Sequence, residues 1–233
     1  MSLQQLWRFA FSSMGCPCAI QIEGVDDSLA ADAARSAIAE VERLNRKYSH
    51  YHDDSLLAAL QRNAAHEAVE VDAETANLLD FAAALHTQSD GLFDITAGAL
   101  TRLWDGTRER LPGTDEIAQA CRRSGWEKLA WQRPHLRLPF PDMHLDLGGM
   151  VKEYAADRAA AICRDAGIRH GVVDLGGDLA VIGAHADGSG WRVGIKDPGA
   201  PDRAIAQIEL NSGGLATSGD YERGLIVDGC RYS

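Results

Sequence analysis

The sequence reads Asp146-Leu-Gly-Gly-Met-Val-Lys152 at the point where a strand-like apolar run, 143–147, gives way to a helix that we expect over 151–166. Glycine has no Cβ, so a glycine pair here lets the backbone come close to a ligand. The first N–H groups of a helix lack partners inside it, and the helix dipole places partial positive charge beside them. The stretch therefore predicts a site for an anion, most simply a phosphate. The alternative is a tight turn that binds nothing.

Two side chains flank this glycine pair. Lys152 is expected in the first turn of the helix, where a cation opposes the dipole unless an anion shares the site; a surface lysine is the alternative. Asp146 ends the strand, and its carboxylate is placed to meet a metal ion or a ligand hydroxyl, or else it only begins the helix. The same four letters recur at Asp174-Leu-Gly-Gly177, which we interpret as a tight connection between two strands.

The 233 residues carry a formal net charge of -11. Nucleic-acid binding is dominated by Lys and Arg that neutralise phosphates, so this charge argues against a nucleic-acid partner. A phosphate site in an acidic protein needs compensation from backbone N–H groups, a lysine or a divalent cation. No apolar run is long enough to span a membrane, and the N-terminus lacks the pattern of a secretory signal. We expect a cytoplasmic protein, or a periplasmic or membrane-anchored one if an export signal has been removed.

The order of elements predicts the fold class. Amphipathic spacing and cap residues predict helices over 28–48, 55–63, 72–86 and 114–123. Strands are expected within 6–23 and at 135–139, 143–147, 171–175, 178–183, 191–196, 204–210 and 224–228. Pro17 suggests that the second N-terminal strand lies at an edge or begins late. The pattern predicts an α+β fold of mixed helices and largely antiparallel sheets, with residues 1–233 in a single domain.

Three further segments offer side chains to a ligand. The break between Gly91 and Gly98 presents Phe93 and Asp94, although an Asx turn with Phe93 in the core explains it as well. Tyr51 follows a helix in polar surroundings and is suited to stack on a planar ring. Residues 217–221 gather hydroxyls, a glycine and a carboxylate in one turn, which suits phosphate oxygens, a metal ion or a plain hairpin.

Taken in order, these segments resemble the ApbE family, the FAD:protein FMN transferases. The resemblance covers essentially the whole chain, and the ordered set is more specific than any one motif. It is carried by Phe11-Ser-Ser-Met14-Gly15, the stretch around Tyr51 and Ser55, Phe93-Asp94-Ile-Thr96-Ala-Gly98, Asp146 to Asp157, Asp174 to Asp178, and Thr217 to Arg223. It implies an ApbE-like, T-fold-like architecture.

The resemblance also implies a reaction: magnesium-dependent transfer of FMN from FAD to a threonine hydroxyl of an acceptor flavoprotein, with release of AMP. By position, it places the contacts to the flavin nucleotide on Met14, Tyr51, Leu92, Phe93, Asp94, Asp146 and Lys152. It places a backbone-carbonyl ligand to Mg²⁺ at Gly149. Magnesium takes oxygen ligands and few of them from protein, which agrees with a carbonyl and one or two Asp side chains.

Two departures from the family pattern bear on activity. Glu153 follows Lys152 where the family often has glycine. The sequence ends at Ser233, before the His-x-x-Asp-Pro segment and the later Asp/Thr segment that the family uses for the general base and the remaining magnesium ligands. We therefore expect a C-terminally incomplete domain that keeps most of its FAD-contacting surface and has little or no transferase activity. The alternatives are an FAD-binding protein without transferase activity and a magnesium-dependent hydrolase that converts FAD to FMN and AMP.

Overall fold

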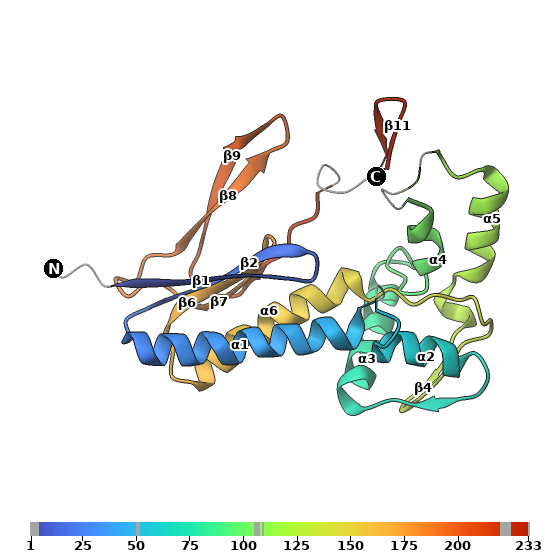
Figure 1. Cartoon of the computed structure of the whole chain (residues 1–233), viewed down its shortest axis with the longest axis horizontal. Coiled ribbons are helices and arrows are strands. Elements are labelled where there is room, and N and C mark those ends of the chain that lie inside the picture. The colour runs from blue at the N-terminus through green and yellow to red at the C-terminus, as the bar shows by residue number, and fades with distance from the viewer. Residues whose placement is uncertain (1–4, 50–51, 105–107, 109, 220–224, 233) are drawn as a thin grey trace. The chain divides into compact units, whose positions relative to one another are not determined.

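The computed structural model describes residues 5–49, 52–104, 108, 110–219 and 225–232. The chain forms two compact units. Figure 1 shows the chain coloured from blue at the N-terminus to red at the C-terminus. Unit 1 comprises Met1–Arg46 and Met150–Ser218, and unit 2 comprises Lys47–Gly149 and Gly219–Ser233. Helices α1 (Asp27–Tyr48) and α6 (Gly148–Asp165) each cross a boundary between the units. The single domain expected over 1–233 stays a prediction.

Unit 1 is built on a five-stranded antiparallel sheet in the order β1-β2-β6-β7-β10. Its strands are Leu6–Ser13, Cys16–Glu23, His170–Leu175, Asp178–Gly183 and Gly214–Leu215. Helices α1 and α6 run along one side of this sheet (Figure 1), and an ion pair between Glu40 and Arg158 links them. Small residues on both helices, such as Ala34 and Ala159, are fully buried.

A two-stranded ribbon continues unit 1 beyond this sheet. Its strands are β8 (Trp191–Asp197) and β9 (Ala200–Leu210). Trp191 is buried against Val172 and Val181, so the first residue of the ribbon is packed against the sheet.

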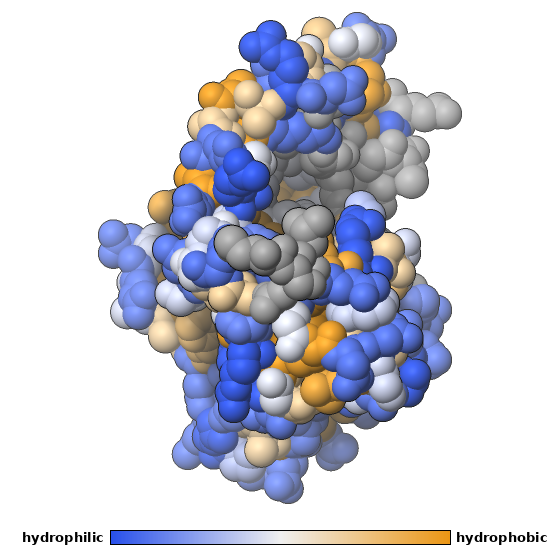
Figure 2. Space-filling model, turned by 90° about the vertical axis from the view of Figure 1, so that its left-hand side faces the viewer, coloured by the Kyte–Doolittle hydropathy of each residue, from blue (hydrophilic) through white to orange (hydrophobic). Residues whose placement is uncertain are grey.

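The face of the protein in Figure 2 is mostly hydrophilic, with hydrophobic residues in small separate patches. Among the helices of the described ranges, none has the length and hydropathy needed to cross a membrane.

Unit 2 combines short helices with two small sheets. The helices are α2 (Leu56–Ala64), α3 (Ala73–Gln88), α4 (Gly98–Thr101), η1 (Arg102–Trp104), α5 (Thr114–Arg123) and η2 (Trp126–Lys128). One sheet pairs β3 (Val69–Glu70), β5 (His135–Arg137) and β4 (Ala130–Gln132), and the other pairs β11 (Leu225–Val227) with β12 (Cys230–Tyr232). Side-chain oxygens of Ser55 and Asp72 cap α2 and α3, as the sequence predicts.

The predicted α+β class is confirmed, since every ladder between named strands is antiparallel and helices occur in both units. One local prediction is confirmed in part and another was wrong. Strand β2 is not an edge, because it lies between β1 and β6, but its pairing with β6 begins late, at Cys18, and this accommodates Pro17. The run 143–147 is not a ladder strand either. Its backbone instead bonds to the loop before α4, where Gly98 N donates to His144 O and Asp146 N donates to Ile95 O.

Candidate functional site

The glycine pair of the first Asp-Leu-Gly-Gly lies inside the helix rather than before it. Helix α6 begins at Gly148, three residues earlier than predicted, because the Asp146 carboxylate caps it: Gly148 N donates to Asp146 Oδ1 at 2.8 Å. The other oxygen, Oδ2, accepts from the Thr101 hydroxyl at 3.3 Å. Asp146 is therefore oriented by contacts on both oxygens, and the helix start carries a fixed negative group.

An aromatic ring lies directly against this helix start. A Cβ added to Gly149 would lie 3.2 Å from Cε2 of Phe93, and one added to Gly148 would lie 3.0 Å from Asp146 Oδ1. Both distances are tighter than ordinary packing, so glycine at these positions is what lets the ring and the carboxylate approach the backbone. The structure thus brings together three of the residues that the sequence singles out, Phe93, Asp146 and Gly149.

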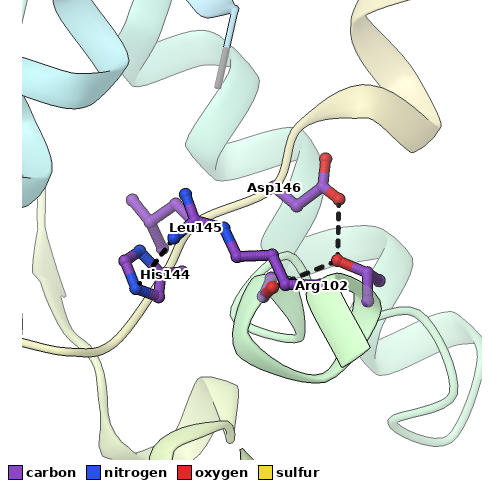
Figure 3. A pocket seen from close by; sticks show the side chains of 6 residues that line it. Arg102, His144, Leu145 and Asp146 are labelled. Atoms are coloured by element: carbon purple, nitrogen blue, oxygen red, sulfur yellow. Dashed lines mark hydrogen bonds between the residues drawn. The ribbon is translucent and has the colours of Figure 1, made fainter. Parts of the chain in front are cut away.

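Behind Asp146 is a small hollow lined by Gly98, Thr101, Arg102, His144, Leu145 and Asp146 (Figure 3). Its volume is about 20 Å³, enough for a water molecule and far too small for a nucleotide. A side chain at Gly98 would meet the carbonyl oxygen of His144 at 2.6 Å, which is why α4 begins on a glycine here. The residues that line the hollow support Asp146, and the hollow by itself is not a ligand pocket.

His144 in this hollow is held neutral. An Arg102 nitrogen lies 3.1 Å from Nε2, and Gln61 Oε1 lies 3.3 Å from Nδ1. Because a guanidinium only donates, Nε2 accepts and Nδ1 carries the proton. Burial, reinforced by the charge of Arg102, lowers the pKa of His144. Thr101, Arg102 and His144 stand in no motif that marks them as site residues in the sequence. The alternation of His144 and Asp146 along an extended segment is a signal that places these two side chains on the same side.

Asp94 acts inside its own loop. Its Oδ1 accepts from the backbone N–H and the hydroxyl of Thr96 at 2.8 and 2.7 Å, and its Oδ2 accepts from Trp126 N at 2.9 Å. The Thr96 hydroxyl in turn accepts from Gly125 N at 2.6 Å. This is an Asx turn that fastens the loop to the start of η2, so both Asp94 oxygens are already engaged.

The neighbours of Asp94 are less enclosed. Phe93 N donates to Ser89 Oγ at 2.8 Å, and the Phe93 carbonyl lies 3.0 Å from His86 Nδ1, so the backbone of Phe93 is fixed at two points. The Phe93 side chain is half-buried, while Leu92 is 91% exposed. A side chain as apolar as leucine gains free energy if a ligand or partner covers it.

Two predicted site residues lie in unit 1, where Met14 forms part of the β1–β2 turn. Met14 and Gly15 have φ values of 51° and 71°, the left-handed conformation of a two-residue hairpin of type I′. Lys152 lies in the second turn of α6, and its Nζ is 2.6 Å from Asp178 Oδ2. The anion beside Lys152 in the structure is therefore Asp178. Tyr51 lies outside the described residues.

The described part of the chain fits magnesium only as a substrate-bound ion. It contains no cluster of three or more His, Cys, Asp or Glu able to hold a metal. Magnesium commonly keeps several waters and is held by one or two protein oxygens together with substrate phosphates. Among the described residues the start of α6 offers the Asp146 carboxylate, which accepts from Gly148 N, and such a single carboxylate suits that second arrangement.

The antiparallel sheets, the flanking helices and the carboxylate-capped, glycine-opened helix start define an α+β protein. The model of the ApbE family matches residues 14–233, and the chain belongs to the ApbE family. This confirms the resemblance on which the sequence interpretation relies.

The chain is similar in sequence to proteins that are named FAD:protein FMN transferases. The FAD:protein FMN transferase of Vibrio cholerae is 31% identical over 219 residues, which cover 92% of this chain and 65% of the relative. The protein of the same name from Salmonella typhimurium is 28% identical and covers 95% and 66%. The chain thus spans slightly less than two thirds of the length of these relatives.

Solved structures show the same fold. The ApbE protein of Thermotoga maritima superposes with a TM-score of 0.87 at 31% identity, over 98% of this chain and 75% of that chain. The flavin transferase ApbE of Vibrio cholerae superposes with a TM-score of 0.85 at 27% identity, over 99% and 75%. The predicted ApbE-like architecture is therefore confirmed.

Proposed function

We propose that the protein takes part in magnesium-dependent transfer of FMN from FAD to a threonine of an acceptor protein, with release of AMP. The observation that carries the proposal is the start of α6, where Phe93 lies against Gly149 and Asp146 caps Gly148. An aromatic ring and the N–H groups of a helix start beside an oriented carboxylate suit a ligand that has both a planar ring system and phosphates.

The proposed reaction forms one bond and breaks one. The threonine oxygen bonds to the phosphorus on the FMN side of the FAD pyrophosphate, and the bond from that phosphorus to the bridging oxygen breaks. AMP leaves with the bridging oxygen, and the hydroxyl proton passes to a base. Bound Mg²⁺ supplies neutralisation of the charge that develops on the pyrophosphate oxygens.

The residues of this chain have binding and orienting roles in the proposal. Phe93 and Leu92 offer apolar surface to the flavin nucleotide, and Asp146 accepts from a ligand hydroxyl or meets the metal ion. Asp94 acts through its loop, because its oxygens already bind Thr96 and Trp126. Met14, Tyr51 and Lys152 complete the proposed contacts, with the Gly149 carbonyl as a magnesium ligand. The proposed compartment is the cytoplasm, with the periplasm or a membrane anchor as the alternative.

Incubation with FAD, Mg²⁺ and a threonine-containing acceptor tests the reaction. Mass spectrometry of the acceptor and chromatography of the nucleotides separate three outcomes. Covalent FMN on the acceptor with AMP in solution supports transfer. Free FMN with AMP supports the hydrolase instead, and bound but unchanged FAD supports a binding protein.

The matched variants are Phe93→Ala and Phe81→Ala. Phe81 is an aromatic side chain of unit 2 on α3 that is 53% exposed, and no role in the site is proposed for it. Loss of FAD binding in Phe93→Ala alone supports the proposed site. Equal FAD binding by both variants and the unmodified protein would exclude Phe93 from it.

A further inference from the structure

Asp178 is a buried carboxylate at the first position of β7. Only 2% of its surface is exposed. Its Oδ1 accepts from the backbone N–H of Thr217 at 2.8 Å, and the Lys152 ammonium lies 2.6 Å from its Oδ2. The Lys152 contact is an ion pair without the angles of a hydrogen bond. One side chain therefore joins α6, the β6–β7 turn and the segment after β10, all within unit 1.

The ion pair restrains Lys152 without hiding it. A buried carboxylate without a compensating partner is strongly disfavoured, so Asp178 needs a cation next to it. Lys152 supplies that charge while 26% of its side chain stays exposed. An ammonium group has three N–H donors, and Asp178 lies on one side of it. Lys152 can therefore contact a second anion from a fixed position.

The Thr217 segment is held from two directions. The Thr217 hydroxyl donates to the Gly177 carbonyl at 2.7 Å, while the Thr217 N–H donates to Asp178. Gly177 has a φ of 95°, and a Cβ there would lie 3.3 Å from Cβ of Thr217. The second Asp-Leu-Gly-Gly is therefore not only a tight turn, because the carbonyl of its last glycine and the carboxylate of the following Asp178 hold Thr217 in place by hydrogen bonds.

We propose that Asp178 is a positioning residue for the nucleotide: it fixes the Lys152 ammonium and the Thr217 segment so that phosphates of the ligand meet a cation in one place. The inference rests on the proposed function, since the ligand is the pyrophosphate of FAD. Asp178 itself does not touch the ligand. Its effect on binding passes through Lys152, and removing its charge releases the ammonium to sample other orientations, which costs binding free energy through lost preorganisation.

The test compares FAD affinity among Asp178→Asn, Lys152→Met, the double variant and Asp157→Asn. Asparagine keeps the size of Asp178 and an oxygen for Thr217 N–H but removes the charge. Asp157 is an exposed carboxylate on α6, and its variant is the matched control. We expect Asp178→Asn to weaken FAD binding about tenfold, the size of one charge-assisted contact, and Asp157→Asn to leave it unchanged.

The double variant separates positioning from a structural role. If Asp178 acts through Lys152, adding Asp178→Asn to Lys152→Met weakens binding no further. Lys152→Met leaves Asp178 buried without a cation, so this variant is the one at risk of not folding, and each variant is first checked by circular dichroism. The double variant leaves no unpaired charge at the site, so it is compared with Asp178→Asn instead if Lys152→Met does not fold. Unchanged affinity in a folded Asp178→Asn, or fully additive losses, would overturn the inference.

A second readout keeps this inference apart from the proposed function. The rate at which an amine-specific reagent modifies Lys152, followed by peptide mass spectrometry, is expected to rise in Asp178→Asn and not in Asp157→Asn. An unmodified protein that binds no FAD would overturn the proposed function and, with it, the nucleotide role of Asp178. An unchanged modification rate in Asp178→Asn would overturn the restraint itself, whether or not FAD binds.

Discussion

Replacing Asp94 by alanine tests whether this side chain fastens its loop or serves mainly as a ligand contact. The change removes three hydrogen bonds, two from Thr96 and one from Trp126 N. Thr96 is fully buried, so its donors lose their acceptor where water does not reach them. A hydrogen bond to a charged group contributes about 1.5–3 kcal/mol. The summed contribution of the three hydrogen bonds is reduced because Asp94 and Trp126 are only half-buried. We therefore expect the free energy of unfolding to fall by about 3 kcal/mol.

The assay is urea unfolding followed by circular dichroism, with hydrogen exchange at Trp126 N as a local readout. Asp90→Asn is the control: Asp90 is exposed in the same loop with a φ of 52°, a conformation that asparagine tolerates well. We expect that variant to unfold within about 0.5 kcal/mol of the unmodified protein. An Asp94→Ala variant of undiminished stability that has lost FAD binding would refute the structural role and make Asp94 a direct ligand contact.

Three further changes have expected outcomes. Gly98→Ala places a Cβ 2.6 Å from the His144 carbonyl oxygen, and we expect about 1–3 kcal/mol of destabilisation, measured as a lower Tm; an unchanged Tm would show that the two segments separate freely. His144 has a lowered pKa, so the unfolded chain binds its proton more readily than the folded one, and stability is expected to fall as pH drops from about 7 towards 5. His144→Gln is expected to flatten that pH profile of unfolding, and identical slopes would contradict the assignment. Leu79 is 1% exposed, so Leu79→Ala leaves a cavity in the core. We expect this variant to lower the free energy of unfolding in urea by about 2–5 kcal/mol, whereas a decrease below about 1 kcal/mol would mean that neighbouring side chains fill the cavity.

The helices were predictable because their signals are local. The apolar spacing of α1 and the cap residues Ser55 and Asp72 lie within a few residues of the helices they specify. The segment 143–147 looked like a strand because it is apolar and extended. It forms no ladder because its backbone groups bond to Ile95 and Gly98, about 50 residues earlier, and this choice depends on tertiary contacts.

The residues of the candidate site likewise fall into those that local sequence signals reveal and those that depend on tertiary contacts. Asp146, Gly149 and Phe93 were found because their motifs occur in a recognisable order, and the packing of Phe93 on Gly149 agrees with that choice. Lys152 carried a local signal, a cation near a helix start, but its partner lies 26 residues away on β7. A buried ion pair of this kind leaves no periodic pattern, so Asp178 emerged only from the folded structure.

Fluorescence titration of FAD with the purified 233-residue chain tests the central claim most directly, because flavin-nucleotide binding underlies every role proposed for the site. We expect saturable quenching that is weakened by Phe93→Ala and unchanged by Phe81→Ala. Flavin fluorescence that does not change at any protein concentration, with the chain shown to be folded by circular dichroism, would contradict the account.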